Sequence, residues 1–181
     1  MIIGITGTLG AGKGTVAKYL VDQKGFKYFS ARAFFIEDVE RRGLPVNRDT
    51  ITEVANDLRA QHGPDYFVKT ALARAQAQEG NSVMESIRTV GEADLLKEQG
   101  AKLWAVDADI KTRYERAVLR GSETDKVSFE KFTADEEREM TSTDPTKQNL
   151  AAVRAMADVI FTNNGTQEEL FSHVEEAIKR A

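Results

Sequence analysis

The sequence contains no cysteine, which excludes disulfide bonds, thiolate metal sites and a cysteine nucleophile. It has only two histidines, His62 and His173, and their wide separation gives no reason to expect a structural zinc site. No apolar run approaches the roughly 20 residues that a membrane-spanning helix needs. The first residues also lack the basic, apolar and cleavable parts of an export signal. These absences predict a cytoplasmic protein without a membrane partner.

Neither basic nor acidic residues are in large excess. The chain has 25 basic and 29 acidic residues, and its net charge of −4 argues against a broad nucleic-acid surface. Its 181 residues suffice for one buried core and are few for two, so residues 1–181 are expected to form one domain. We expect a monomer or a homodimer.

The strongest positive signal lies in the first 20 residues, MIIGITGTLGAGKGTVAKYL. Residues 1–5 are rich in β-branched side chains and predict a short buried strand. A loop with four glycines follows, at Gly7, Gly10, Gly12 and Gly14. Backbone N–H groups of such a loop form a concave anion site, to which the N-terminus of the next helix and the charge of Lys13 contribute. The segment therefore predicts phosphate binding.

The spacing of these glycines can be compared with two known glycine-rich motifs and with a simple turn between a strand and a helix. The pattern GxxxxGK(S/T) is matched at Gly7, Gly12 and Lys13, but Gly14 stands where serine or threonine is expected, ahead of Thr15. The dinucleotide pattern GxGxxG fails at Thr15, and no acidic residue follows at the expected distance. A simple turn that connects the strand to the helix would explain one or two of the four glycines.

The stretch GTLGAGKGT closely resembles the loop of adenylate kinases and related nucleoside monophosphate kinases, which belong to the P-loop NTPases. The resemblance implies that ATP and Mg²⁺ are the cofactors and that a nucleotide is the small-molecule substrate. The implied ATP-binding residues are Gly7, Thr8, Leu9, Gly10, Ala11, Gly12, Lys13, Gly14 and Thr15. With Gly14 lacking a hydroxyl, Thr15 is the metal candidate in this loop.

Strand and helix patterns alternate along the rest of the chain. Apolar runs predict strands at residues 1–5, 26–30, 82–86, 102–106 and 158–161. Helical spacing predicts helices at 13–24, 31–42, 50–60, 64–79, 92–98, 110–119, 129–139, 145–156 and from 167 onwards. Capping-box spacing marks two of the starts, at Thr50 with Glu53 and at Thr166 with Glu169. The alternation predicts an α/β three-layer sandwich with a five-stranded parallel sheet.

Two segments are longer than a simple alternation of one strand and one helix requires. Residues 31–80 carry three helices, and residues 113–145 are polar and charged, with a connection at 121–126 that we expect to be mobile. Ligands of open α/β sheets bind beyond the carboxyl ends of the strands, where both segments would lie. In the monophosphate kinases that the chain resembles, the first insertion grips the phosphate acceptor and the second is a lid that carries arginines.

Two residues near the end of the third strand are candidates for phosphoryl transfer, which depends on positioned positive charge. Arg88, in the sequence MESIR, aligns with the arginine of the monophosphate-kinase segment Asp-Gly-Phe-Pro-Arg. Glu85 stands where that segment has aspartate, and the resemblance makes it a ligand of Mg²⁺ and its water and, with Arg88, a substrate-binding residue. The glycine and proline of the segment are absent. The alternatives are a surface charge for Arg88 and a polar strand end for Glu85.

Three arginines in the second insertion share one helical face, Arg113, Arg116 and Arg120. Their position after the fourth strand resembles the lid hinge of adenylate kinase and of dephospho-coenzyme A kinase. The resemblance favours Arg116 and Arg120 as triphosphate contacts and catalytic residues beside Lys13 and Arg88. Arg138 is a weaker candidate. The alternative is a solvated face whose ion pairs each contribute roughly 0–1 kcal/mol.

Four residues of the first insertion are acceptor-binding candidates. Arg32 follows the second strand, where monophosphate kinases place a phosphate-binding arginine, and Phe35 with Phe34 could line the pocket. Aromatic pairs at this spacing are more often core residues. Asp65 and Tyr66 begin a helix and could contact the acceptor base or sugar, although Asp65 also suits the helix dipole.

The tail ADVIFTNNGTQEEL resembles the end of dephospho-coenzyme A kinases and of archaeal adenylate-kinase-like proteins. In those families this strand, turn and helix flank the adenine of ATP, which implies contacts from Asn164, Gly165 and Thr166. A well-capped turn without a ligand explains the same residues.

Three functions follow from these features. The first is an ATP-dependent kinase of nucleoside or deoxynucleoside monophosphates. The second is phosphorylation of a hydroxyl, as in dephospho-coenzyme A kinase, but that family has an aspartate as base after the second strand, where this chain reads Ser30, Ala31 and Arg32. The third is a regulatory ATPase without a small-molecule acceptor.

Overall fold

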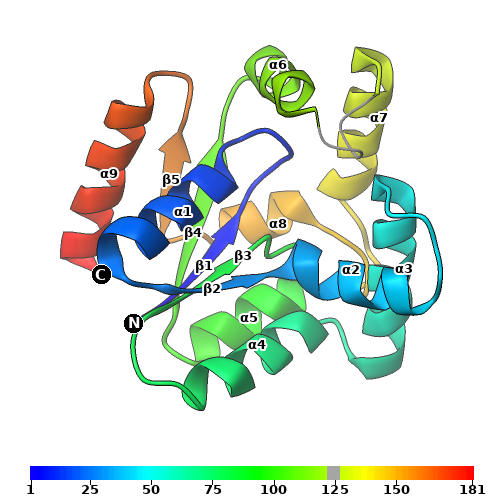
Figure 1. Cartoon of the computed structure of the whole chain (residues 1–181), viewed down its shortest axis with the longest axis horizontal. Helices are drawn as coiled ribbons and strands as arrows, with labels where there is room; N and C mark the ends of the chain where they lie inside the picture. The colour runs from blue at the N-terminus through cyan, green and yellow to red at the C-terminus, as the bar shows by residue number, and fades with distance from the viewer. Residues whose placement is uncertain (122–126) are drawn as a thin grey trace.

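A computed structural model describes residues 1–121 and 127–181 and contains one parallel sheet. The strands are β1 (Ile2–Thr6), β2 (Lys27–Ser30), β3 (Ser82–Glu85), β4 (Lys102–Asp107) and β5 (Val159–Thr162). Their order is β2-β3-β1-β4-β5, with β1 in the middle (Figure 1). The predicted five-stranded parallel sheet is confirmed. All carboxyl ends of the strands consequently lie along one edge of the sheet.

Helices cover both faces of this sheet. The helices are α1 (Lys13–Lys24), α2 (Ala31–Arg41), α3 (Arg48–His62), α4 (Tyr66–Gln76), α5 (Val90–Glu98), α6 (Ile110–Arg120), α7 (Phe129–Met140), α8 (Leu150–Ala155) and α9 (Gln167–Arg180). Helices α1 and α9 pack on one face, and α4, α5 and α8 pack on the other (Figure 1). The predicted three-layer α/β sandwich is confirmed.

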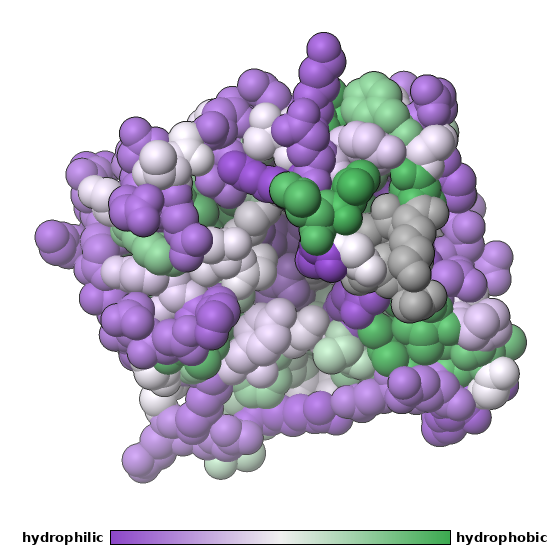
Figure 2. All heavy atoms as spheres, turned by 45° about the horizontal axis from the view of Figure 1, so that its top comes forward, coloured by the Kyte–Doolittle hydropathy of each residue, from purple (hydrophilic) through white to green (hydrophobic). Residues whose placement is uncertain are grey.

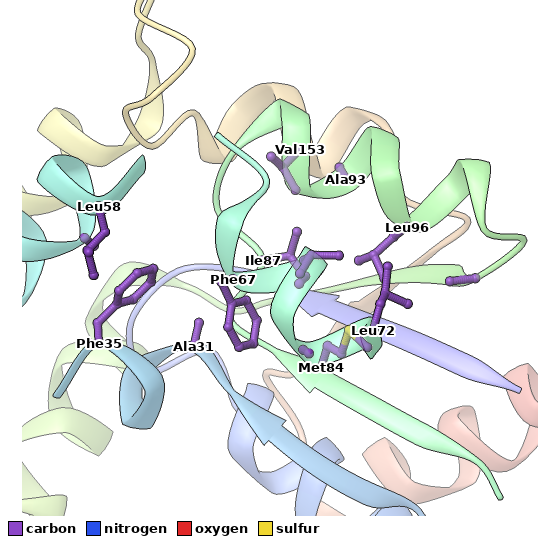
Figure 3. Close-up of a cluster of buried hydrophobic side chains, with 14 of the residues drawn as sticks. Ala31, Phe35, Leu58, Phe67, Leu72, Met84, Ile87, Ala93, Leu96 and Val153 are labelled. Atoms are coloured by element: carbon purple, nitrogen blue, oxygen red, sulfur yellow. The ribbon is translucent and has the colours of Figure 1, made fainter. Parts of the chain in front are cut away.

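Alternation along the strands divides the core into two clusters. Val83 and Trp104 face α1 and α9, whereas their neighbours Met84 and Leu103 face the opposite layer. Strands buried on both faces need apolar residues at successive positions, which explains why these segments read as continuous apolar runs. Figure 3 shows that Phe35 from α2 also belongs to this second cluster. The helices of residues 31–80 thus share a core with the sheet.

Two helices begin at residues other than the predicted ones. The predicted capping box of Thr50 and Glu53 is wrong, because α3 begins at Arg48 and Asn47 is its cap, with Asn47 Oδ1 accepting from the Thr50 N–H at 2.9 Å. Helix α8 begins at Leu150, not at residue 145. The Asp144 carboxylate accepts from the N–H and the hydroxyl of Thr146, and this local turn replaces the expected helix start.

Capping boxes begin two other helices. The predicted box of Thr166 and Glu169 is confirmed at α9. A second box, of Thr89 and Glu92, begins α5 two residues before the predicted start. Helix α4 begins at Tyr66, so Pro64 precedes it. Of the predicted connection at 121–126, residues 122–126 lie outside the described residues. Across the described part of the chain, no helix combines the length and the apolar character required to cross a membrane.

Candidate functional site

The glycine-rich loop joins β1 to α1 at the carboxyl edge of the sheet, and its glycines are sterically required. A Cβ at Gly7 would lie 2.1 Å from the carbonyl oxygen of Val106, and the φ angle of Gly7 is +138°. A Cβ at Gly10 would lie 2.3 Å from the carbonyl oxygen of Arg113. Only glycine fits such contacts, which bring the loop against β4 and α6. At Gly14, by contrast, no atom lies within 4 Å of the added Cβ.

Lys13 is the buried cation of this loop. Its side chain is 7% exposed, and Nζ donates to the carbonyl oxygen of Thr8 at 2.9 Å. Burial lowers the pKa of Lys13 to about 8, and the nearby Arg88 guanidinium lowers it as well, whereas Glu85 and Glu139 raise it. An anion bound at the loop would favour the charged form of this amine.

A groove of about 1230 Å³ opens beside the loop. Figure 2 turns this end of the molecule towards the viewer and shows it hollowed, with both hydrophilic and hydrophobic atoms at the rim of the hollow. Ten of the sequence-predicted residues line the groove: Gly10, Gly12, Lys13, Gly14, Thr15, Arg32, Glu85, Arg116, Arg120 and Gly165. Residues from both ends and from the middle of the chain therefore meet in one cavity large enough for a nucleotide.

The three arginines of α6 have different surroundings. Arg116 Nη1 donates to the carbonyl oxygen of Asn163 at 2.8 Å, and Arg116 and Arg120 line the groove. Arg113 is 5% exposed, donates to the carbonyl oxygen of Ala108 at 2.7 Å and pairs with Glu136 of α7. The interpretation of Arg113 as part of a solvated face is therefore wrong, because its guanidinium is buried between the loop, α6 and α7.

Glu85 ends β3 at the groove, and two hydroxyls fix its carboxylate. The Tyr28 hydroxyl donates to Oε2 at 3.0 Å, and the Ser86 hydroxyl donates to Oε1 at 2.9 Å. Partial burial and the Glu85 carboxylate raise the pKa of Tyr28 to about 12, so its hydroxyl stays a donor into alkaline pH. Ser86 has a φ of 75°, a costly backbone conformation for a residue with a side chain.

Oxygen ligands suited to Mg²⁺ are present at the groove in Glu85 and Thr15. Within the described residues, no group of three or more histidine, cysteine, aspartate or glutamate side chains is placed to hold a metal ion. The donor set therefore fits a Mg²⁺ ion that takes most of its ligands from phosphate oxygens and water.

A second cavity, of about 100 Å³, adjoins the groove and shares Arg32 and Ser86 with it. It lies between α2, α3, the end of β3 and α7. Its lining is Ala31, Arg32, Phe35, Arg48, Ile51, Thr52, Ala55, Arg59, Ser86, Arg88, Glu139 and Gln148. We call it the arginine cavity, because four arginines and a single carboxylate supply its charged side chains.

Arg59 is the most deeply buried of the four. It is 1% exposed, lies over the Phe35 ring at 5.0 Å from the ring centre, and donates from Nη2 to Glu92 Oε1 at 3.2 Å. Its Nε and Nη1 find no hydrogen-bond partner among the described residues. Buried donors of a guanidinium are almost always paired, which makes these two groups candidates for hydrogen bonds to a bound anion.

Arg88 and Arg48 meet at one carboxylate in the arginine cavity. Arg88 Nη1 donates to Glu139 Oε2 at 2.9 Å, and Arg48 Nε donates to Glu139 Oε1 at 3.0 Å. Burial raises the pKa of Glu139, but the two guanidiniums outweigh burial and hold that pKa below its usual range. Gln148 also accepts from Arg88 Nη1, at 2.5 Å, which fixes the Arg88 side chain.

A family profile described as "AAA domain" matches residues 3–144. The chain belongs to this AAA domain family. Among curated relatives it is similar to the UPF0200 protein TK1334 of Thermococcus kodakarensis, with 26% identity over 98% of this chain and 96% of that protein. It is also similar to a UPF0200 protein of Sulfurisphaera tokodaii, with 29% identity over 99% and 96%.

Solved structures show the same fold as this AAA domain. TT1252 from Thermus thermophilus matches with a TM-score of 0.64 at 21% identity, over 99% of this chain and 97% of that chain. A shikimate kinase from Bacteroides thetaiotaomicron matches with a TM-score of 0.57 at 14% identity, over 99% and 96%. The AAA domain therefore has a kinase-like P-loop fold. These comparisons do not single out adenylate kinase or dephospho-coenzyme A kinase.

Some predicted residues lie outside both cavities. Asp65 and Tyr66 line neither, and Tyr66 stacks on His62 with ring centres 4.5 Å apart. Asn164 accepts from the N–H of Asp109, and Thr166 caps α9. Phe35, a predicted acceptor residue, is 2% exposed and serves both the core and the wall of the arginine cavity.

Sequence reasoning missed Arg48, Arg59, Glu139 and Gln148. Arg59 carried a signal, because it continues the apolar stripe of Ile51, Val54, Ala55 and Leu58 on α3. A charged residue on the buried face of a helix needs a partner or a ligand. The other three are polar residues in polar segments, and their convergence is visible only in three dimensions.

Proposed function

We propose that this protein is an ATP-dependent kinase that transfers the γ-phosphoryl group to a nucleoside or deoxynucleoside monophosphate. The observation that carries the proposal is the pair of adjoining cavities, a groove beside the glycine-rich loop and a smaller cavity with four arginines. Phosphoryl transfer between two phosphates requires two anion sites side by side and positive charge between them.

The donor ATP occupies the groove in this proposal. Loop N–H groups and Lys13 bind its β- and γ-phosphates, and Arg116 and Arg120 contact the triphosphate. The turn at 164–166, of which Gly165 lines the groove, flanks the adenine. Thr15 and Glu85 would hold Mg²⁺, which would supply positive charge next to the phosphates of ATP.

The acceptor phosphate binds between the groove and the arginine cavity. Arg32, which lines both, and Arg88 face an oxygen of this phosphate, which attacks the γ-phosphorus as the bond to the ADP oxygen breaks. No general base is needed, because a phosphate oxygen is already an anion at neutral pH. A cavity of about 100 Å³ accepts one anionic group, so the nucleoside remains in the larger groove. Residues 31–80 are then the acceptor-binding insertion, and 113–145 the lid region.

One observation favours a second candidate, phosphorylation of a hydroxyl on an anionic acceptor. The Glu85 carboxylate lies in the groove and is held by two hydroxyl donors, so it could accept the proton of an acceptor hydroxyl. Against this, the chain has Ser30, Ala31 and Arg32 where a base would follow β2, and the Ser30 hydroxyl caps α2. Dephospho-coenzyme A is an acceptor of this hydroxyl-bearing, anionic class.

The proposal is tested by an acceptor screen with ATP and Mg²⁺ in which ADP formation is followed. We expect at least one ribo- or deoxyribonucleoside monophosphate to raise turnover above that of the protein alone. Stimulation only by dephospho-coenzyme A or another hydroxyl acceptor would select the second candidate. Slow hydrolysis that no acceptor stimulates would refute both and leave a regulatory ATPase.

A further inference from the structure

The arginine cavity already contains an anionic group that belongs to the chain. Glu139, at the C-terminal end of α7, is 3% exposed and accepts hydrogen bonds from Arg88 and Arg48 with its two carboxylate oxygens. These arginines come from the loop after β3 and from the start of α3. The Glu139 carboxylate thus makes the contacts that the anionic group of a ligand would make in this cavity.

The carboxylate leaves donors of the cavity without partners. Nε and Nη1 of Arg59 and Nη1 of Arg48 are buried and have no hydrogen-bond partner in the part of the chain that the structure describes. Glu139 has only two oxygens, and both already accept from Arg88 or Arg48. A ligand that satisfies the remaining donors therefore needs more acceptor oxygens and more charge than a carboxylate has.

We propose that Glu139 determines which anions the cavity accepts, because it occupies the place of the ligand's anionic group until a phosphomonoester dianion displaces it. This inference rests on the proposed function and names the acceptor class of the same site. Outside the lining, Glu92 pairs with Arg59 and Asp135 lies 3.7 Å from Arg48, so the four arginines still outnumber these carboxylates and Glu139 together, which favours an incoming dianion.

Competition by Glu139 discriminates against carboxylate ligands. A carboxylate ligand would make the same contacts as the Glu139 carboxylate that it displaces, so it gains nothing from the exchange. Glu139 is tethered to the chain and competes at an effective concentration on the order of millimolar or higher. A phosphomonoester has a second charge and three terminal oxygens, so it can bind Arg88 and Arg48 and also reach Arg59. The cavity therefore selects phosphate over carboxylate through a residue of the lid region.

Calorimetric titrations with inorganic phosphate and with acetate test this inference without ATP or turnover. Wild-type protein should bind phosphate at least roughly tenfold more tightly than acetate. Glu139→Gln removes the competing charge, so we expect it to bind acetate roughly tenfold more tightly than wild type does. Glu137→Gln is the matched control, because it removes the same charge from an exposed position of α7 and should bind as wild type.

Phosphate also binds at the glycine-rich loop, and Glu139 acts on the pKa of Lys13 there, so the acetate titrations of wild type and Glu139→Gln carry the test. Equal affinity of wild type for acetate and phosphate would overturn the inference, as would acetate affinity unchanged by Glu139→Gln. If that variant does not fold, Glu139→Asp replaces it, because its shorter side chain holds the carboxylate farther from the arginines, and it should likewise bind acetate more tightly than wild type. Tighter acetate binding by Glu139→Gln without any acceptor-stimulated turnover would refute the kinase proposal and leave the role of Glu139 intact.

Discussion

Arg59 and Glu92 form an ion pair in which both side chains are fully buried, with Nη2 of Arg59 3.2 Å from Oε1 of Glu92. The other oxygen of Glu92 accepts from the backbone N–H groups of Arg88 and Thr89. One carboxylate thus completes the capping box of α5, holds the backbone at Arg88 and supports the guanidinium over the arginine cavity. The pair joins the acceptor-binding insertion of our proposal to the sheet.

Removing Glu92 should strongly destabilise the fold. Glu92→Ala leaves Arg59 as a buried cation without its acidic partner and removes half of the capping box, so we expect a loss of about 3–5 kcal/mol in the free energy of unfolding. Urea denaturation measures the change. Asp94→Ala, an exposed carboxylate on the same helix, is the control and should change stability by less than about 0.5 kcal/mol. Equal effects of the two substitutions would contradict the role of the buried pair.

Replacing Arg59 should affect the acceptor and spare ATP. Arg59→Met keeps the long apolar stem but removes a charged donor from the arginine cavity, a loss of about 3 kcal/mol, or roughly 100-fold in acceptor affinity. It also leaves Glu92 buried without its partner, at a cost of about 3–5 kcal/mol in the free energy of unfolding, so the kinetics are measured where urea denaturation shows that the variant is folded. We expect the KM for the acceptor to rise by that factor while the KM for ATP stays within about twofold of the wild-type value. Arg74→Met, at an exposed position of α4, is the control. A change confined to the KM for ATP would assign Arg59 to the donor.

The two glycines at the ends of the loop motif should respond oppositely to alanine. Gly7→Ala places a Cβ against the backbone of β4 at positive φ, so we expect unfolding free energy to fall by about 3 kcal/mol. In Gly14→Ala the added Cβ has no atom within 4 Å, and Gly14 lies in α1. Alanine favours a helix over glycine by about 0.5–1 kcal/mol, so we expect this variant to be slightly more stable. Urea denaturation of both variants checks the pair. A stable Gly7→Ala protein would show that the loop does not need its close approach to Val106.

The pH dependence of kcat/KM for ATP should follow the protonation of Lys13. The pKa of this buried amine is lowered to about 8 in the free protein, so the charged form that binds phosphate is lost as pH rises through that value. We therefore expect kcat/KM for ATP to fall above pH of about 8, by about tenfold per pH unit. Lys13→Arg stays charged over this range and should lack the decline, whatever its absolute rate. A decline that persists in Lys13→Arg would assign it to another group.

Sequence periodicity predicted the five strands and the order of the helices because each pattern is local and repeated over several residues. The glycine-rich loop was predictable for the same reason, since its chemistry lies within nine consecutive residues. Helix starts were harder to predict. Asn47 and Thr50 are both suitable caps, and tertiary context decides between them. Asp144 was expected to begin a helix but closes a turn on Thr146.

The arginine cavity was only partly predictable, because its residues come from segments far apart in the chain. Arg48 and Glu139 are 91 positions apart, and neither belongs to a recognisable motif. Arg88 was found because the segment after β3 resembles a monophosphate-kinase motif, whereas Arg59 belongs to no such segment. The pairing of arginines with a carboxylate depends on how α3 and α7 pack, which no local pattern specifies.

The central claim is that the γ-phosphoryl group moves to a phosphate of the acceptor, and phosphorus-31 NMR tests it most directly. Wild-type protein would be incubated with ATP, Mg²⁺ and the nucleoside monophosphate that stimulates turnover most. Our account predicts that the β-phosphate resonance of a nucleoside diphosphate made from the acceptor grows in step with ADP. Accumulation of inorganic phosphate with the monophosphate unchanged would contradict it.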